Sequence, residues 1–249
     1  MRHHDAVSIV SEEKQVILAH AEKSEKNFTA TKKRAEDIKM KVNSEKTQLL
    51  CISARVGSEV KSYIRVDNTE IQSVNELKIL GFWFGNRRNV NLHVSKLCQK
   101  IRSKLWTLHR LRRSGMSAED LLTVYKTIHR AIIDFASPTY HPLLTATQSD
   151  QIEQLQRRAL KIVYGHEISY KNCLELAQIP LLSERRSKLA LNFALKTSNN
   201  PKFSDGWFPK KTLSNHYTRN PQTYLEPRAR TERMRRNPIN YMRRELNNM

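Results

Sequence analysis

The stretch Asn89–Gly115, NVNLHVSKLCQKIRSKLWTLHRLRRSG, decides the fold. Its apolar residues recur every three or four positions, which is the period of one face of an amphipathic helix. These residues are Val94, Leu97, Ile101, Leu105 and Leu108. Because a glycine follows the last periodic residue and its basic neighbours, the helix is expected to end at Gly115. The stretch therefore predicts a long helix with one face packed against other helices.

The residues that follow predict a helical bundle up to about residue 200. Ser117, with Asp120 three residues later, is typical of a helix N-terminal cap. The expected apolar stripe of this second helix is Leu121, Tyr125, Ile128, Ile132 and Phe135. The prolines of SPTYHP, residues 137–142, end it because proline cannot continue the helical hydrogen-bond ladder. The later helices are expected to end at Gly165, Pro180 and Pro201.

Upstream of the long helix, the pattern changes to strands. A polar helix is expected from about Glu22 to Met40, followed by four strand-like segments. These are Gln48–Ser53, Ser62–Asp67, Glu70–Val74 and Lys78–Phe84, with a hairpin turn at 67–69. The predicted fold class is α+β: a small antiparallel sheet, then a helical bundle, then an irregular basic tail. The expected divisions are 1–21 (unassigned), 22–85 (helix and strands), 86–200 (helical domain) and 201–249 (tail).

The charge balance points to a polyanionic partner. The 249 residues include 44 Lys and Arg against 24 Asp and Glu, a net charge of +20. Such a surface attracts nucleic acid, although a ribosomal-type, chromatin-associated or merely basic protein has the same composition. The three cysteines are far apart and form no CxxC pair, so neither a disulfide framework nor a zinc site is expected. Without an apolar run of 18 residues, we expect an intracellular protein with no membrane partner.

The long helix also carries the most unusual charge pattern. Nine Lys or Arg and no Asp or Glu occur between residues 87 and 113. Cations one turn apart repel one another, whereas a phosphate backbone would neutralise them and release counterions. The candidate nucleic-acid-binding residues here are Lys96, Lys100, Arg102, Lys104, Arg110, Arg112 and Arg113. The alternative is an ordinary solvated helix face.

Two further basic groups are weaker candidates. Arg157, Arg158 and Lys161 lie near the end of the third helix, where cations also stabilise the helix C-terminus, so a purely structural role fits equally well. From residue 196 onward, twelve Lys or Arg face four Asp or Glu, as in a solubilising tail. Trp83, Trp106 and Trp207 are candidates for stacking on bases, but Trp83 lies within a strand and Trp106 beside the apolar stripe, so both are expected to pack in the core instead. No histidine pair has metal-binding spacing, so no metal site and no cofactor are expected.

Four ordered motifs resemble the downstream half of reverse transcriptases from non-LTR, LINE-type retrotransposons. They are RAEDIKMKVNSEKTQLLCIS (34–53), LKILGFWFG (77–85), the segment 121–165 and SERRSKLALNFALKTSNNPKFSDGWFP (183–209). The resemblance covers roughly residues 30–249. It implies the end of a polymerase palm at 22–85, a thumb-like helical domain at 86–200 and a basic tail. The implied partner is RNA or an RNA–DNA duplex, in a nuclear or cytoplasmic ribonucleoprotein.

The resemblance also implies roles for residues of the palm remnant. Lys46 matches the family lysine proposed to protonate the leaving pyrophosphate, and Asn43 is expected to hold its turn. Leu80, Gly81 and Phe82 match the primer grip, which positions the 3′ end of the primer. The family enzyme needs Mg²⁺ held by carboxylates, one pair of which lies in an aromatic-x-Asp-Asp motif. This chain contains no Asp-Asp, and Asp5 is at most a remnant of that motif.

The chain is therefore expected to be a truncated RNA-directed DNA polymerase, not an enzyme as it stands, that retains nucleic-acid binding. The alternative is a basic module that binds RNA or acidic proteins. Residues 74–142 are also similar to the helical module named after the N-terminus of AlkB-homologue proteins, which elsewhere precedes a dioxygenase and a methyltransferase. Neither an iron-binding pattern nor a Gly-rich methyltransferase turn accompanies that similarity.

Overall fold

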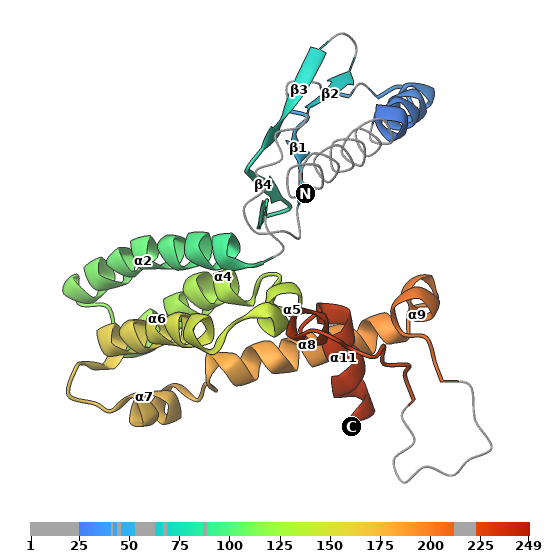
Figure 1. Cartoon of the computed structure of the whole chain (residues 1–249). Helices are drawn as coiled ribbons and strands as arrows, with labels where there is room; N and C mark the ends of the chain where they lie inside the picture. Colours follow the sequence, from blue (N-terminus) through green and yellow to red (C-terminus); the bar gives the residue numbers. More distant parts are fainter. Residues whose placement is uncertain are drawn as a thin grey trace, which may run out of the picture. The chain divides into compact units, whose positions relative to one another are not determined.

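The chain folds as an α+β protein, which confirms the predicted class. The computed structural model describes residues 25–40, 42–43, 46–52, 63–66, 69–86, 89–211 and 223–249 (Figure 1). The chain divides into two compact units, Met1–Asn89 and Val90–Met249. Asp5, Arg87, Arg88 and the turn residues Asp67 and Asn68 lie outside the described residues.

The described part of the first unit contains a small mixed sheet and a helix. Residues 25–37 are helical. The strands are β1 (Leu49–Leu50), β2 (Tyr63–Val66) and β3 (Thr69–Val74), in the order β1-β3-β2. The antiparallel β2–β3 pairing, with Ile64 opposite Ile71, agrees with the expected hairpin, but β1 pairs in parallel with β3. Ile64 and Ile71 form the core of this unit with Phe28 from the helix.

A second hairpin replaces the single strand expected over Lys78–Phe84. β4 (Glu76–Ile79) and β5 (Phe82–Gly85) are antiparallel, with Ile79 opposite Phe82. The two residues between them have left-handed backbones, with φ of 47° at Leu80 and 86° at Gly81. Positive φ at both central residues is typical of a type I′ turn, whose twist matches that of the strands. The sequence did not predict this turn because the apolar run is continuous and only one of the two turn residues is a glycine.

The second unit is a helical bundle built on two parallel helices, α2 (Asn91–Arg113) and α6 (Ala146–Tyr164). Side-chain contacts tie the two helices together at both ends. The Gln148 amide donates to Asn91 Oδ1 (2.9 Å) near the N-termini, and the Arg112 guanidinium donates to the Lys161 carbonyl oxygen (3.2 Å) near the C-termini. The α2 residues of the predicted apolar stripe are all buried, so this helix is confirmed.

The second predicted helix has a different buried face from the one expected. It comprises α3 (Ala118–Val124), the π-helical segment η1 (Tyr125–Arg130) and α4 (Ala131–Asp134), and Ser117 caps it as predicted. A π-helix has more residues per turn than an α-helix, so residues four apart stay on one face. The buried residues are accordingly Leu121, Tyr125, His129 and Ile133. The expected stripe residues Ile128 and Phe135 are instead 41% and 53% exposed.

The prolines that end this helix also begin new short ones. Pro138 lies in the first turn of α5 (Ser137–Tyr140), and Pro142 in that of the 3₁₀-helix η2 (His141–Leu143). The first turn tolerates proline because its N–H groups lack helical partners in any case. Ala136, in the left-handed conformation, makes the bend between α4 and α5. Asp134 binds the Arg185 guanidinium at 2.7 Å and so attaches the end of α4 to α8.

A buried hydrogen-bond network joins α6 to α7 (Tyr170–Ala177) and α8 (Leu182–Ser198). The Glu153 carboxylate of α6 accepts a hydrogen bond from the backbone N–H of Leu182 (3.0 Å), and therefore caps the N-terminus of α8. It also accepts from the Tyr170 hydroxyl. The Gln156 amide donates to the Pro180 carbonyl (3.2 Å), while its Oε1 accepts from the Tyr125 hydroxyl (2.6 Å).

Replacing Tyr125 with phenylalanine is expected to lower the free energy of unfolding by about 1–2 kcal/mol, because it leaves the buried Gln156 oxygen without a donor. Urea unfolding of the two proteins measures the difference. Tyr164→Phe is the matched control, since Tyr164 lies against the same core and its hydroxyl has no hydrogen-bond partner among the described residues. Equal losses in the two variants would show that the hydroxyl bond to Gln156 does not stabilise the bundle.

The tail is more ordered than predicted. Its described part contains α9 (Pro201–Trp207), α10 (Glu232–Arg235) and α11 (Pro238–Asn247). Phe208 and Met242 are buried against Ala194 of α8. The Arg243 guanidinium donates to the carbonyl of Trp207 at 2.6 Å. Part of the tail therefore packs on the bundle, and at least one of its cations has a structural partner.

A buried polar cluster lies where α5 and η2 meet α8. Arg186 is fully buried; its Nη2 donates to Ser149 Oγ at 2.8 Å, while Nε and Nη1 have no partner in the described part of the chain. Burial lowers the pKa of His93 to about 4, and burial together with the Arg186 charge lowers that of His141 to about 4. Both imidazoles are therefore neutral at pH 7.

The three cysteines are free thiols. Within the described ranges, no helix is both long and apolar enough to cross a bilayer.

Candidate nucleic-acid interface

The solvent-facing side of α2 is entirely without acidic residues and carries most of the predicted binding residues. Lys100, Arg102, Arg110 and Arg113 are exposed, and Lys96 and Lys104 are half-buried. We call these six residues the α2 basic face. No ion pair joins Lys100, Arg102, Arg110 or Arg113 to an acidic side chain within the described residues. Their charges therefore remain available to an external anion.

Five of the six cations of the α2 basic face lie in two ridges, each with members four residues apart. One ridge contains Lys96, Lys100 and Lys104, and the other contains Arg102 and Arg110 with Trp106 between them. Because an α-helix turns 100° per residue, Lys100 and Arg102 project about 160° apart, so the two ridges lie on different flanks of the apolar stripe. On the lysine flank, the Lys104 carbonyl accepts a hydrogen bond from His129 Nε2 at 3.0 Å.

Arg112 has a structural role. Its Nη1 donates to the carbonyl oxygens of Lys161 and Ile162, in the last turn of α6. The Lys161 carbonyl also accepts from the Gly165 N–H at the end of the helix, and the helix dipole places partial negative charge at this end. Arg112 thus stabilises the end of α6 and is committed to that contact. The sequence could not distinguish it from Arg110 or Arg113, because its partner lies 49 residues away.

The α6 candidates do not all join the α2 basic face. The Arg157 guanidinium lies 4.9 Å from the Tyr170 ring centroid, in a cation–π contact with α7. Arg158 is exposed, and Lys161 is half-buried beside Arg112 at the C-terminal ends of the two helices. The structural interpretation left open for these residues therefore applies to Arg157, through its contact with Tyr170.

Trp106 contradicts the prediction that it packs in the core. Its side chain is 61% exposed, and the Arg110 guanidinium lies 4.8 Å from its ring centroid. Leu105 and Leu108, on either side of Trp106 in the sequence, are both buried. The apolar stripe of α2 therefore lies on a different side of the helix from Trp106. Core packing is the preferred expectation from the sequence because a tryptophan beside an apolar stripe is usually buried, and the exposed indole leaves the base-stacking alternative open.

In the first unit, the primer-grip-like residues form the tip of the β4–β5 hairpin. Leu80 is 91% exposed, and Phe82 contacts Phe84 with ring centroids 4.9 Å apart. Lys46 is exposed and follows a turn in which Asn43 Oδ1 accepts a hydrogen bond from the Lys46 backbone N–H at 3.1 Å. The Thr47 hydroxyl donates to the Asn43 carbonyl at 2.9 Å. Asn43 therefore holds this turn, as expected from the resemblance.

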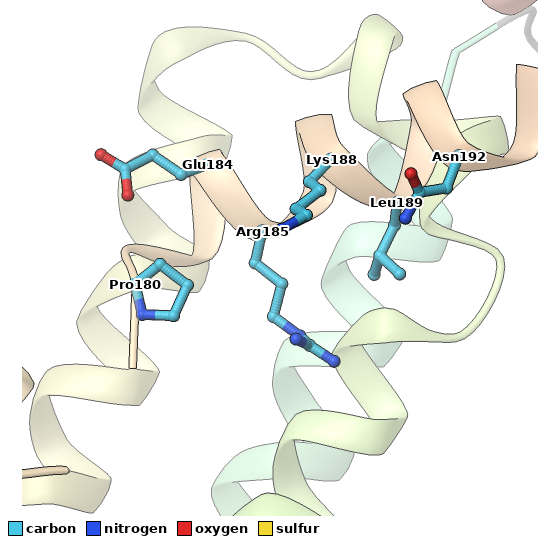
Figure 2. A pocket seen from close by; sticks show the side chains of 6 residues that line it. All are labelled: Pro180, Glu184, Arg185, Lys188, Leu189 and Asn192. Carbon is cyan, nitrogen blue, oxygen red and sulfur yellow. The ribbon is translucent and has the colours of Figure 1, made fainter. Parts of the chain in front are cut away.

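A hollow on α8 is the alternative location for an anion-binding site (Figure 2). It is lined by Pro180, Glu184, Arg185, Lys188, Leu189 and Asn192. Its strongest anion-binding group, Arg185, donates to both Asp134 carboxylate oxygens, at 3.0 and 2.8 Å from Nε. Because this guanidinium is already paired, we consider the hollow a weaker anion-binding candidate than the α2 basic face.

Comparison of the chain with known protein families, with curated proteins and with solved structures finds no match. No group of three or more His, Cys, Asp and Glu side chains that could hold a metal ion occurs among the described residues. The sequence contains no Asp-Asp, the pair of carboxylates with which the polymerases that it resembles hold Mg²⁺.

Proposed function

We propose that this chain binds a nucleic-acid duplex through the α2 basic face, as the thumb-like remnant of a truncated non-LTR reverse transcriptase. The observation that carries the proposal is the acid-free solvent side of α2, on which Lys100, Arg102 and Arg110 are exposed. A duplex of RNA, or of RNA and DNA, supplies the closely spaced phosphates that offset the repulsion between these cations. No polymerase activity is part of this proposal.

Packing within the bundle holds α2, and therefore its cations, in a fixed position. The buried side of α2 contacts α3, η1 and α6, and contacts near both ends of α2 fix it to α6. A binding helix that is already ordered loses little conformational entropy when it contacts the sugar-phosphate backbone. Contacts to phosphate fix the position of a duplex but carry no base sequence. We therefore expect binding that depends on duplex form rather than on base sequence, in a nuclear or cytoplasmic ribonucleoprotein.

The strength of the interaction should depend steeply on salt. Four exposed cations, or six with the half-buried Lys96 and Lys104, neutralise about as many phosphates. Each phosphate contact contributes about −0.9 to the slope of log K against log salt concentration, so the expected slope is about −4 to −5. Fluorescence anisotropy with a labelled 20-base-pair RNA–DNA duplex, from 50 to 300 mM KCl, measures this slope. The same titration with a single strand is expected to show weaker binding.

Two results would contradict the proposal. One is a slope near zero, which would exclude counterion release as the main driving force. The other is tight binding of an acidic polypeptide, such as poly-glutamate, combined with weak duplex binding at low salt. That second result would favour the alternative that the basic helices form a protein-interaction module.

A further inference from the structure

Trp106 is the most unusual residue of α2, although it is not one of the six cations of the α2 basic face. It is exposed to 61% in the middle of the Arg102–Trp106–Arg110 ridge, where a polar side chain would interact better with water. Its ring is covered on one side by the Arg110 guanidinium, at 4.8 Å from the ring centroid. Arg102 lies one helical turn away in the other direction. An exposed indole, with one guanidinium group against its ring and a second arginine one helical turn away, is therefore available beside the cations that we propose contact nucleic acid.

The chemistry of this ridge fits a nucleobase. Tryptophan stacks on the flat face of any base, and a guanidinium group adds cation–π stabilisation. An apolar protein partner would need a larger apolar surface than one indole, and the exposed α2 residues around it are polar or cationic. Within a duplex the base faces are covered by their neighbours, so the only bases that can stack on Trp106 are unpaired ones.

We propose that Trp106, together with Arg110, forms a stacking site for an unpaired nucleobase next to the duplex that the α2 basic face holds. This inference rests on the proposed duplex binding and extends it from the backbone to the bases. It assigns the substrate as a duplex with a single-stranded extension. Stacking tolerates all four bases, so the site adds selectivity for strand structure and not for sequence.

The test uses the full chain with Trp83→Phe and Trp207→Phe, which leaves Trp106 as the only tryptophan. A blunt duplex and the same duplex with a four-nucleotide single-stranded extension are titrated against this protein. Stacking predicts saturable quenching of the Trp106 emission by the extended duplex, and at least about fivefold tighter binding of the extended than of the blunt duplex. Trp106→Leu is expected to remove this preference while leaving the affinity for the blunt duplex unchanged.

Phe135→Leu serves as the matched control, because Phe135 is another exposed aromatic residue of the same unit and is 53% exposed. It is expected to keep the preference for the extended duplex. If Trp106→Leu also keeps that preference, or if both duplexes bind without changing the Trp106 emission, the stacking site is refuted while duplex binding stands. If neither duplex binds, the proposed function and the stacking site fail together.

Discussion

Reversing the charge of two exposed residues on the α2 basic face, Lys100→Glu with Arg102→Glu, is expected to weaken duplex binding about 60-fold at 0.1 M salt. Two phosphate contacts are lost, and each contributes nearly tenfold at that salt concentration. The slope of log K against log salt concentration should become less negative by about two. Both side chains are exposed on α2, so the helix and its packing should be preserved. The measurement is the same anisotropy titration, repeated at several salt concentrations.

Arg228→Glu with Arg230→Glu is the matched control for this variant. It changes the net charge by the same amount, and both residues are exposed in the tail. If binding depends only on total charge, the two double variants will weaken it equally, and the α2 basic face will have no special role. The account predicts that the tail variant retains most of the wild-type affinity. This comparison therefore separates a localised interface from general attraction between a basic protein and a polyanion.

Acidification from pH 7 to pH 5 is expected to lower the free energy of unfolding of the helical unit by about 4 kcal/mol, about 2 kcal/mol for each of His93 and His141. Burial lowers the pKa of both residues to about 4 in the folded protein, below the ordinary value of 6.5. Between these two pH values the unfolded chain binds more protons than the folded one. Stability from this source is therefore complete above pH 6.5 and is lost as the pH falls towards 4.

Urea unfolding at pH 7 and pH 5 measures this loss, followed by circular dichroism of the helices. His93→Gln and His141→Phe should each reduce the difference between the two pH values by about half, because each removes one buried titrating group. His166→Gln, which changes an exposed histidine, should leave it unchanged. A loss of stability that persists in full when both buried histidines are replaced would assign the acid sensitivity to other groups.

The sequence predicts the helices of the second unit well where one face is strongly periodic. The α2 stripe and the cap at Ser117 agree with the structure because local residues determine them. The buried face of the next helix could not be predicted, because the π-helical segment changes the residue period after Val124. The β4–β5 hairpin was missed for a similar reason, since Leu80 adopts a backbone conformation that leucine rarely takes.

The candidate interface was predicted as a set of residues but not as a surface. Lys100 and Arg102 are exposed as a basic helix face requires, whereas Arg112 and Arg157 contact α6 and α7 through partners distant in the sequence. Charge patterning shows that cations are concentrated, but only tertiary packing shows which of them have other contacts. Arg186 illustrates the same limit: adjacent arginines at 185 and 186 suggest a surface, yet Arg186 is fully buried.

The most direct test of the account is a lysine-labelling footprint of the full chain with and without saturating RNA–DNA duplex. Acetylation of each lysine is measured by mass spectrometry. The account predicts that Lys100, and to a smaller degree the half-buried Lys96 and Lys104, become protected, while the exposed Lys171 and Lys188 of α7 and α8 keep their reactivity. Unchanged labelling of the three α2 lysines, with protection appearing instead at Lys202 and Lys210 in the tail, would contradict it.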